Sequence, residues 1–197
     1  MLVPLLVGMM MFAPGGCATW SMPEDVDDAD LRERAVSKTA GDVRLSASVL
    51  GSGDSKRLFG TDVNSSGIQP VWVEVENSGP DSLWLLRAGT DPDYFSPLEA
   101  AWLFHTPLAR KRNSAIDKHF GALDFSNPIP AHSTRSGVIF TNPHERIRLL
   151  NIDLLGPGRV IPFTLFLPDP DNPPDESIPE LVTRDSETAP LDIRNTD

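Results

Sequence analysis

Two stretches of alternating apolar and polar residues constrain the fold of this chain more than any other feature of its sequence. Over residues 43–49 every second residue is apolar, and residues 71–76 place three valines at every second position. Successive side chains of a β-strand point to opposite faces of a sheet, so a period of two predicts half-buried strands. The chain therefore needs at least one sheet with a buried face.

Further runs rich in apolar and β-branched residues predict more strands. They lie at 133–141, 146–155 and 160–167 and are separated by proline and glycine breakers. A turn at 77–81 is expected to fold the chain back through 82–88 as a hairpin. No strand is followed by the regular amphipathic helix that a parallel crossover requires. We therefore expect a mainly β, immunoglobulin-like antiparallel β-sandwich over residues 42–168, with at least six strands.

A short two-helix insertion is expected at about residues 96–120. Ser96 supplies an N-cap hydroxyl, Pro97 occupies the first helical position, and Glu99 stands where it completes a capping box. Thr106-Pro107 repeats the cap and the proline, which predicts a second helix through about Phe120. We expect both helices to pack over one end of the sandwich.

The net charge of −11 resides mainly in the two ends of the chain. Residues 18–40 carry six acidic and three basic residues, and residues 168–197 carry nine and two. Subtracting the −3 and −7 of these segments from −11 leaves −1 for residues 41–167. We expect residues 17–41 to form an acidic tether with a short surface helix within 27–38. We expect residues 169–197, acidic and proline-rich, to form a disordered tail.

The first 17 residues indicate export and lipid attachment. Residues 1–13 are apolar and uncharged but too few to span a membrane, and small residues at 14–16 precede Cys17, the single cysteine. This pattern is typical of a bacterial lipoprotein signal peptide over residues 1–16, with Cys17 as the lipid attachment point. No basic residue precedes the apolar run, and Pro14 replaces the usual aliphatic residue, so a plain secretory signal with a free cysteine is the alternative. Ala18 favours the outer membrane.

The sequence lacks the motifs of the common enzyme classes. It has no G-x-S-x-G, G-x-G-x-x-G or G-x-x-x-x-G-K segment, and its four histidines are 12 to 14 residues apart, without a short chelating pair. One cysteine is too few for a cysteine-based zinc site or an iron–sulfur cluster. An acidic chain repels a phosphate backbone, so we expect no nucleic-acid partner. We also expect no catalytic residue, no metal and no cofactor.

Two local groups of charged residues remain as candidate binding residues. Three carboxylates within residues 91–99 supply oxygen ligands of the kind that Ca²⁺ prefers, unless they only shape a turn and a helix cap. A basic cluster at 110–112 either contacts lipid phosphates or an acidic partner, or forms a solvated helix face. The candidate binding residues are Asp91, Asp93, Tyr94, Glu99, Arg110, Lys111 and Arg112. Three tryptophans either line a ligand groove or pack in the core and at its rim: Trp72, Trp84 and Trp102.

Four long stretches, in order, resemble a known family. They are GIQPVWVEVEN (67–77), LWLLRAGTDPDYFSPLEAAW (83–102), NPIPAHSTRSGVIFTNP (127–143) and LLNIDLLGPGRVIPFTLFLP (149–168). They look like the N-terminal module of bacterial envelope lipoproteins that carry an LssY-type C-terminal domain, and the likeness covers roughly residues 17–168. That C-terminal domain is not found in this sequence. The resemblance implies an envelope location and a recognition module, and it carries over no catalytic residue.

These observations lead to one expected function and two alternatives. We expect a membrane-anchored bacterial envelope lipoprotein that serves as a non-catalytic binding or scaffolding module. Ala18, the residue after the cysteine, places it at the outer membrane, facing the periplasm. Its expected partners are the membrane, through the lipid, and an unidentified envelope protein. One alternative is a truncated remnant of a larger LssY-type protein. The other, less favoured, is a periplasmic hydrolase that uses acidic residues of 91–99 or a histidine.

Overall fold

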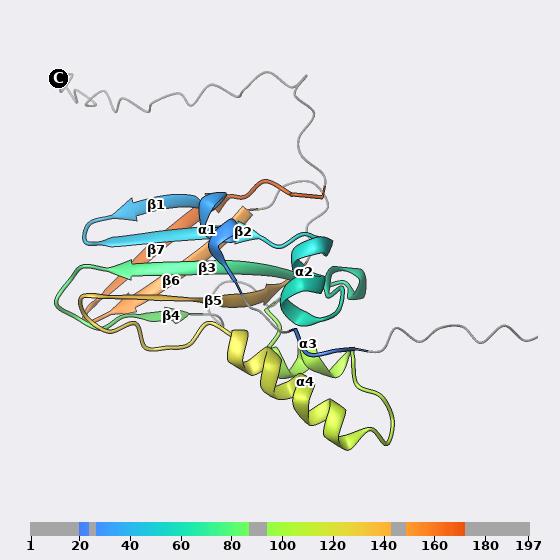
Figure 1. Cartoon of the computed structure of the whole chain (residues 1–197). Helices are drawn as coiled ribbons and strands as arrows, with labels where there is room; N and C mark the ends of the chain where they lie inside the picture. The colour runs from blue at the N-terminus through green and yellow to red at the C-terminus, as the bar shows by residue number, and fades with distance from the viewer. Residues whose placement is uncertain (1–19, 24–26, 87–93, 143–148, 172–197) are drawn as a thin grey trace, which may run out of the picture.

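Seven strands in two antiparallel sheets form the centre of this computed structural model (Figure 1). The structure describes residues 20–23, 27–86, 94–142 and 149–171. The four-stranded sheet has the order β1-β2-β3-β5 and the three-stranded sheet the order β4-β6-β7. The strands are β1 (Val36–Ala40), β2 (Val43–Val49), β3 (Gln69–Asn77), β4 (Trp84–Leu86), β5 (Ser133–Thr141), β6 (Leu149–Gly156) and β7 (Arg159–Phe166). The expected mainly β fold is confirmed.

The two sheets face each other across one hydrophobic core. The apolar residues at alternate positions of β2 and β3, such as Leu45 and Val73, point into this core and are fully buried. Ile152, Leu154 and Phe163 meet them from the three-stranded sheet. The alternation seen in the sequence thus marks the face of the four-stranded sheet that packs against the other sheet.

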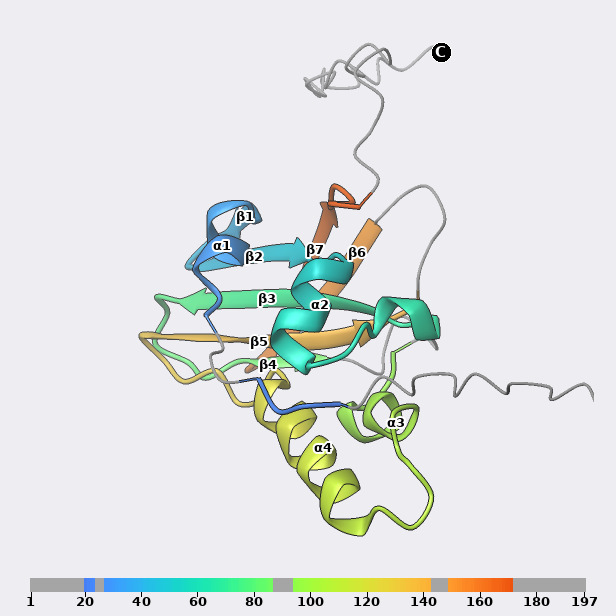
Figure 2. The same cartoon turned by 45° about the vertical axis from the view of Figure 1, so that its right-hand side comes forward.

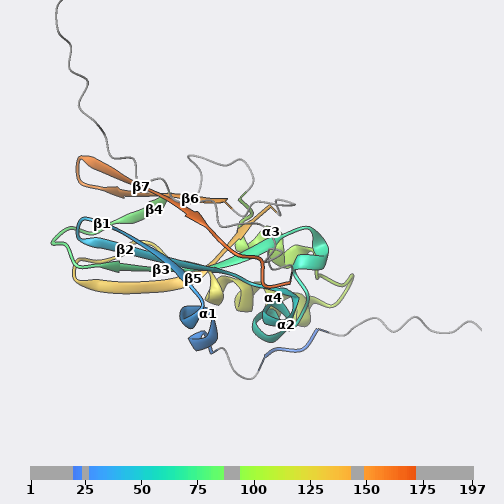
Figure 3. The same ribbon diagram turned by 90° about the horizontal axis from the view of Figure 1, so that it is seen from above.

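A second core covers the opposite face of the four-stranded sheet, so that the domain has three layers (Figure 3). Its helices are α1 (Ala29–Glu33), α2 (Ser52–Phe59), α3 (Pro97–Trp102) and α4 (Arg110–Leu123), with a 3₁₀ turn η1 (Asn64–Ser66). Phe59 of α2 and Phe120 of α4 have ring centroids 4.8 Å apart, and Phe120 stacks at 5.8 Å on Phe140 of β5. Contacts between aromatic rings therefore join two helices to the sheet.

Two short helices occur where the sequence predicts them, but their start and placement differ from the expectation. The second helix begins at Arg110 and not near Thr106, because Leu108 has a left-handed φ of 65° that interrupts the helix. The Asn113 side chain closes this loop by bonding the backbone N and O of Thr106 at 3.0 and 2.9 Å. Instead of sitting over one end of the sandwich, α4 lies with α2 along the outer face of the four-stranded sheet, next to α3 (Figure 2).

The predicted hairpin between residues 71–76 and 82–88 is wrong. Both edges of β3 are occupied, by β2 on one side and by β5 on the other. Residues 84–86 therefore cross to the other sheet, where β4 pairs with β6. Residues 77–81 end the strand β3, as the sequence predicts. A turn, however, does not specify which strand the following segment pairs with.

The path of the chain also differs from that of an immunoglobulin constant domain. Such domains divide seven strands as four and three, as here, but their third strand already lies in the second sheet. In this protein β1, β2 and β3 are consecutive neighbours in one sheet, and β4 is the first strand to cross. The division into four and three strands therefore agrees with the immunoglobulin-like expectation, whereas the strand order does not.

The segment expected to be an acidic tether belongs largely to the folded domain. Residues 36–40 form β1, which pairs with β2 along its whole length, and Leu31 of α1 is fully buried. The short helix expected within 27–38 is α1. Further upstream, the Trp20 indole N–H donates to the Phe59 carbonyl oxygen at 2.6 Å. The expected signal peptide over residues 1–16, Cys17 and residues 172–197 of the acidic tail lie outside the described residues.

Two glycines provide a matched test of this architecture. A Cβ at Gly137 of β5 would lie 2.5 Å from the Phe125 Cα and 2.7 Å from its backbone N, whereas a Cβ at Gly121 of α4 would meet no atom within 4 Å. We expect Gly137→Ala to lower the free energy of unfolding by about 1–3 kcal/mol, because backbone atoms cannot move aside easily. Gly121→Ala should raise it by up to about 1 kcal/mol, because alanine favours a helix. Urea denaturation measures both, and equal stability of the two variants would contradict the packing described.

Candidate interaction surface

The acidic candidates do not form a metal site among the described residues. Asp91 and Asp93 lie outside them. Glu99 completes the capping box of α3: its carboxylate accepts from the Ser96 N–H at 2.8 Å, and the Ser96 hydroxyl accepts from the Glu99 N–H at 3.2 Å. The backbone hydrogen bond from Ser96 lowers the pKa of Glu99 below its usual range. Glu99 thus serves the helix cap, which the sequence allowed as an alternative.

Tyr94 also has a structural partner. Its hydroxyl donates to the Asn151 carbonyl oxygen of β6 at 3.2 Å, and its ring packs against the core between the sheets. No group of three or more histidine, cysteine or acidic residues that could hold a metal occurs in the described part of the chain. Tyr94 therefore links the segment before α3 to the three-stranded sheet.

The basic cluster at the start of α4 divides into two kinds of residue. The Arg112 guanidinium turns back toward the loop and donates to the Thr106 hydroxyl at 3.4 Å. Arg110 and Lys111 are exposed at the first turn of α4. Only Arg110 and Lys111 of the cluster present their charges outward.

Two of the histidines also have structural partners. A ring nitrogen of His105 is 2.8 Å from the Asp117 carboxylate, and a ring nitrogen of His119 is 2.6 Å from the Leu58 carbonyl oxygen.

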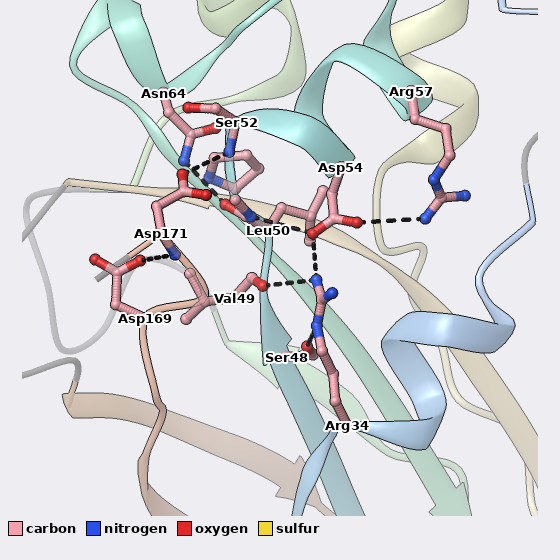
Figure 4. A network of polar contacts seen from close by, with 12 residues as sticks. Arg34, Ser48, Val49, Leu50, Ser52, Asp54, Arg57, Asn64, Asp169 and Asp171 are labelled. Carbon is pink, nitrogen blue, oxygen red and sulfur yellow. Dashed lines mark hydrogen bonds and ion pairs between the residues drawn. The ribbon is translucent and has the colours of Figure 1, made fainter. Parts of the chain in front are cut away.

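A polar network around the start of α2 joins four distant segments (Figure 4). Asp54 accepts from the Gly51 N–H at 3.2 Å and pairs with Arg34, whose guanidinium also reaches the Ser48 hydroxyl at 3.1 Å. Asp171, beyond β7, accepts from the Ser52 N–H at 2.6 Å. The glycine-rich residues 51–53 thus begin a helix. The Ser52 amide binds Asp171 near the C-terminal end of the described domain, and the Asp54 side chain binds Arg34 near its N-terminal end.

A groove of about 270 Å³ lies on the outer face of the four-stranded sheet beside α1. Its central charge is Arg32, which bonds Glu74 at 2.9 Å and Asp28 at 3.1 Å and lies 5.4 Å from the centroid of the Trp72 ring. The hydrogen bonds that Arg32 donates to the Glu74 carboxylate raise the pKa of Arg32. Two carboxylates therefore already compensate the charge of Arg32, and Glu33, Arg44 and Glu76 line the rest of the groove.

The outer face of the three-stranded sheet is different, because it exposes large apolar side chains. Trp84 pairs with Leu155, and Leu155 pairs with Val160, so these three form one row across β4, β6 and β7. Leu149 and Phe166 form a second row near the other end of the sheet. Their exposed fractions run from 40% to 68%, highest at Phe166. We call these five residues the apolar sheet face.

Polar residues separate the two rows of the apolar sheet face. The Thr164 hydroxyl bonds the Asn151 side chain at 2.8 Å, and Asp153 lies opposite Pro162. An exposed cluster of aromatic and aliphatic side chains interrupted by polar groups is the usual composition of a protein-binding surface. The apolar sheet face is therefore the candidate interaction surface on this side of the domain.

Sequence reasoning missed this surface, although a signal for it exists. Residues 149–155 (LLNIDLL) and 159–167 (RVIPFTLFL) are apolar at positions of both parities. In a sheet with one solvated face, only one parity should be apolar. The excess apolar residues on the second parity are those that the structure exposes. Of the three tryptophans considered as groove residues, Trp72 is buried beside α1, whereas Trp84 and Trp102 are exposed on different parts of the surface.

Comparisons with protein-family models, with curated proteins and with solved structures yield no match to this chain. Within the described residues, no helix is both long enough and apolar enough to span a bilayer.

The Glu99 cap predicts a pH-dependent contribution to stability. Because the pKa of Glu99 is lower in the folded protein than its ordinary 4.5, its charged form stabilises the fold above that value, and this contribution is lost as pH falls through the lowered pKa. Glu99→Gln should therefore be less stable than wild type at neutral pH, and the difference should shrink under acid conditions. Urea unfolding at several pH values measures this. A difference that grows as pH falls would contradict the assignment.

Proposed function

We propose that the protein is a bacterial envelope lipoprotein, held at the membrane by a lipid on Cys17, whose β domain is a non-catalytic binding or scaffolding module. The apolar residues 1–13, the small residues 14–16 and the single cysteine support the anchor. We place the protein at the outer membrane, facing the periplasm, on Ala18. We also propose a relationship to the LssY-type lipoproteins, which rests on the four stretches of sequence. We propose an immunoglobulin-like architecture only in one respect, which is that seven strands are divided between the two sheets as four and three.

The apolar sheet face carries the binding part of this proposal. Phe166 is 68% exposed and Val160 is 53% exposed, and both belong to β7, next to the exposed side chains of β6. Leaving such side chains in water forgoes the free energy of their burial, about 1.5–3 kcal/mol for each large apolar side chain. A partner that covers this face would recover part of it. We propose that the partner is another protein of the envelope, which contacts the two apolar rows and the polar residues between them.

The other candidate residues are better explained by structure than by chemistry. Glu99 caps α3, Tyr94 bonds the backbone of β6, and Arg112 bonds the loop before α4. Each side chain has a partner that its element needs. The described candidates therefore give no support to the hydrolase alternative, and Asp91 and Asp93 lie outside the described residues.

The lipid anchor is tested by metabolic labelling. Wild type and Cys17→Ala are expressed with a palmitate analogue, followed by detergent phase partition. We expect label and partition into the detergent phase for wild type, and loss of both for Cys17→Ala, because the thiol is the acceptor of the lipid. Label that persists in Cys17→Ala, or an unlabelled wild type, would overturn the anchor.

The interaction surface is tested by photo-crosslinking in cells. A photoreactive phenylalanine analogue replaces Phe166 or Leu155 of the apolar sheet face, or, as a control, the exposed Thr39 of β1. We expect one discrete adduct from positions 166 and 155 and none from 39. Phe166→Glu should suppress the adduct from position 155 at least tenfold, because it places a charge in the buried interface. Equal adducts from all three positions would contradict a specific surface.

A further inference from the structure

The described N-terminal segment is fixed against the helical layer. Besides its bond to the Phe59 carbonyl, Trp20 sets its ring edge-on against His119 of α4, with centroids 6.1 Å apart. The next residue passes so close to Gly60 that a Cβ there would lie 2.1 Å from the Ser21 carbonyl oxygen. The chain at residues 20 and 21 is therefore held between α2 and α4 and does not hang free.

This attachment limits how far the domain can stand from an anchor at Cys17. Only two residues, Ala18 and Thr19, lie between Cys17 and Trp20, so the Cα atoms of Cys17 and Trp20 can be at most about 11 Å apart. A lipid on Cys17 would therefore hold the helical layer at the bilayer surface, and the long tether expected from the sequence would not exist. With such an anchor, the helical layer would be the side of the domain next to the membrane.

Beside this segment, α3 and the loop that follows it expose a group of large apolar side chains. Trp102 is 64% exposed and Leu103 is 55% exposed, and Leu108 is fully exposed with a left-handed φ of 65°. Leu98, on the first turn of α3, is also exposed. A single exposed leucine is ordinary, but four large apolar side chains in one short stretch, one of them in a strained conformation, indicate a contact surface.

The charges of the same region fit an anionic surface. Although the chain as a whole carries −11, residues 97–123 contain four basic and two acidic residues. The two acidic residues already have partners, because Glu99 caps α3 and Asp117 bonds His105. Arg110 and Lys111 follow directly on the exposed loop. Tryptophan and leucine beside arginine and lysine is the composition of segments that lie in the membrane–water interface.

We propose that Leu98, Trp102, Leu103 and Leu108, with Arg110 and Lys111, form a helical corner that contacts the surface of an anionic bilayer. The apolar side chains enter the interfacial region, and the two cations bind lipid phosphates. The inference rests on the proposed anchor at Cys17 for its orientation. The corner belongs to the helical part of the molecule, whereas the apolar sheet face belongs to the three-stranded sheet. The two surfaces are therefore formed by different elements, and a domain that contacts the membrane through the corner would leave the apolar sheet face for an envelope protein.

Two exposed tryptophans on different sides of the domain allow a direct test. The full chain is incorporated into phosphatidylcholine vesicles that contain phosphatidylglycerol and brominated acyl chains, which quench tryptophan fluorescence at contact. Trp102→Phe should remove a measurable part of the lipid-dependent quenching, the remainder coming from Trp20 beside the anchor, whereas the matched control Trp84→Phe should leave it unchanged. Quenching that is the same in wild type and Trp102→Phe would overturn the corner.

A second variant tests the charges. Arg110→Glu/Lys111→Glu should weaken lipid-dependent quenching at least about fivefold at low salt, because each basic residue near an anionic surface favours binding by roughly that factor. Lys38→Glu, on the exposed edge strand β1, is the control and should have no effect. Equal quenching in vesicles without phosphatidylglycerol would overturn the role of the two cations.

The outcomes separate this inference from the proposed function. Palmitate label on Cys17 without Trp102-dependent quenching would preserve the anchor and overturn the corner. Trp102-dependent quenching without label would support the corner and overturn the anchor. Sedimentation in the absence of vesicles tests whether the helical corner instead binds a second copy of the chain. If wild type is a dimer and Trp102→Phe is a monomer, the corner is a dimer interface, and the lipid contact is overturned.

Discussion

The four-stranded sheet is buried on both faces, and the rest of the structure depends on this. Strand β3 lies in its interior, with Val73 in the core between the sheets and Trp72 in the core beneath the helices. A sheet that must be covered twice requires two different partners, here a second sheet and a layer of helices. Because β2 and β5 occupy both edges of β3, the following strand β4 cannot pair with β3, and it pairs with β6 in the other sheet.

The three-layer arrangement leaves the outer surfaces unequal. The helices shield their own apolar residues against the four-stranded sheet, but the three-stranded sheet presents its second face to solvent. That face carries Trp84 and Phe166, which gain nothing from exposure. The helical corner shows a similar excess at Trp102 and Leu108. Apolar side chains exposed on two separate parts of the surface agree with a domain held between a membrane and a protein partner, as we propose.

Charged residues contribute mainly to joining segments that are distant in sequence. Asp54 and Asp171 hold the start of α2 to residues near each end of the described domain, and Arg32 ties α1 to β3 through Glu74. Asp171 accepts a hydrogen bond from a backbone amide at the start of α2, where the first amides of a helix have no partner within the helix. Asp54 and Glu74 pair with guanidinium groups through charge-assisted hydrogen bonds. Of the acidic residues near the ends of the chain, Asp28 and Asp171 therefore serve the fold as well as solvation, which the charge pattern alone did not indicate.

The sequence by itself determined the local structure of this protein: the strands at 43–49, 71–76 and 133–141, the capped helix at Ser96, and the breaks between them. These follow from period-two alternation and from capping chemistry, which act between residues close in sequence. Only the tertiary structure decided that β4 pairs with β6, that residues 36–40 add a strand, and that α2 begins at the glycine-rich segment. It alone also decided which exposed residues gather into surfaces. Strand partners and surface neighbours depend on competition among segments far apart in the chain, and no local pattern records the outcome of that competition.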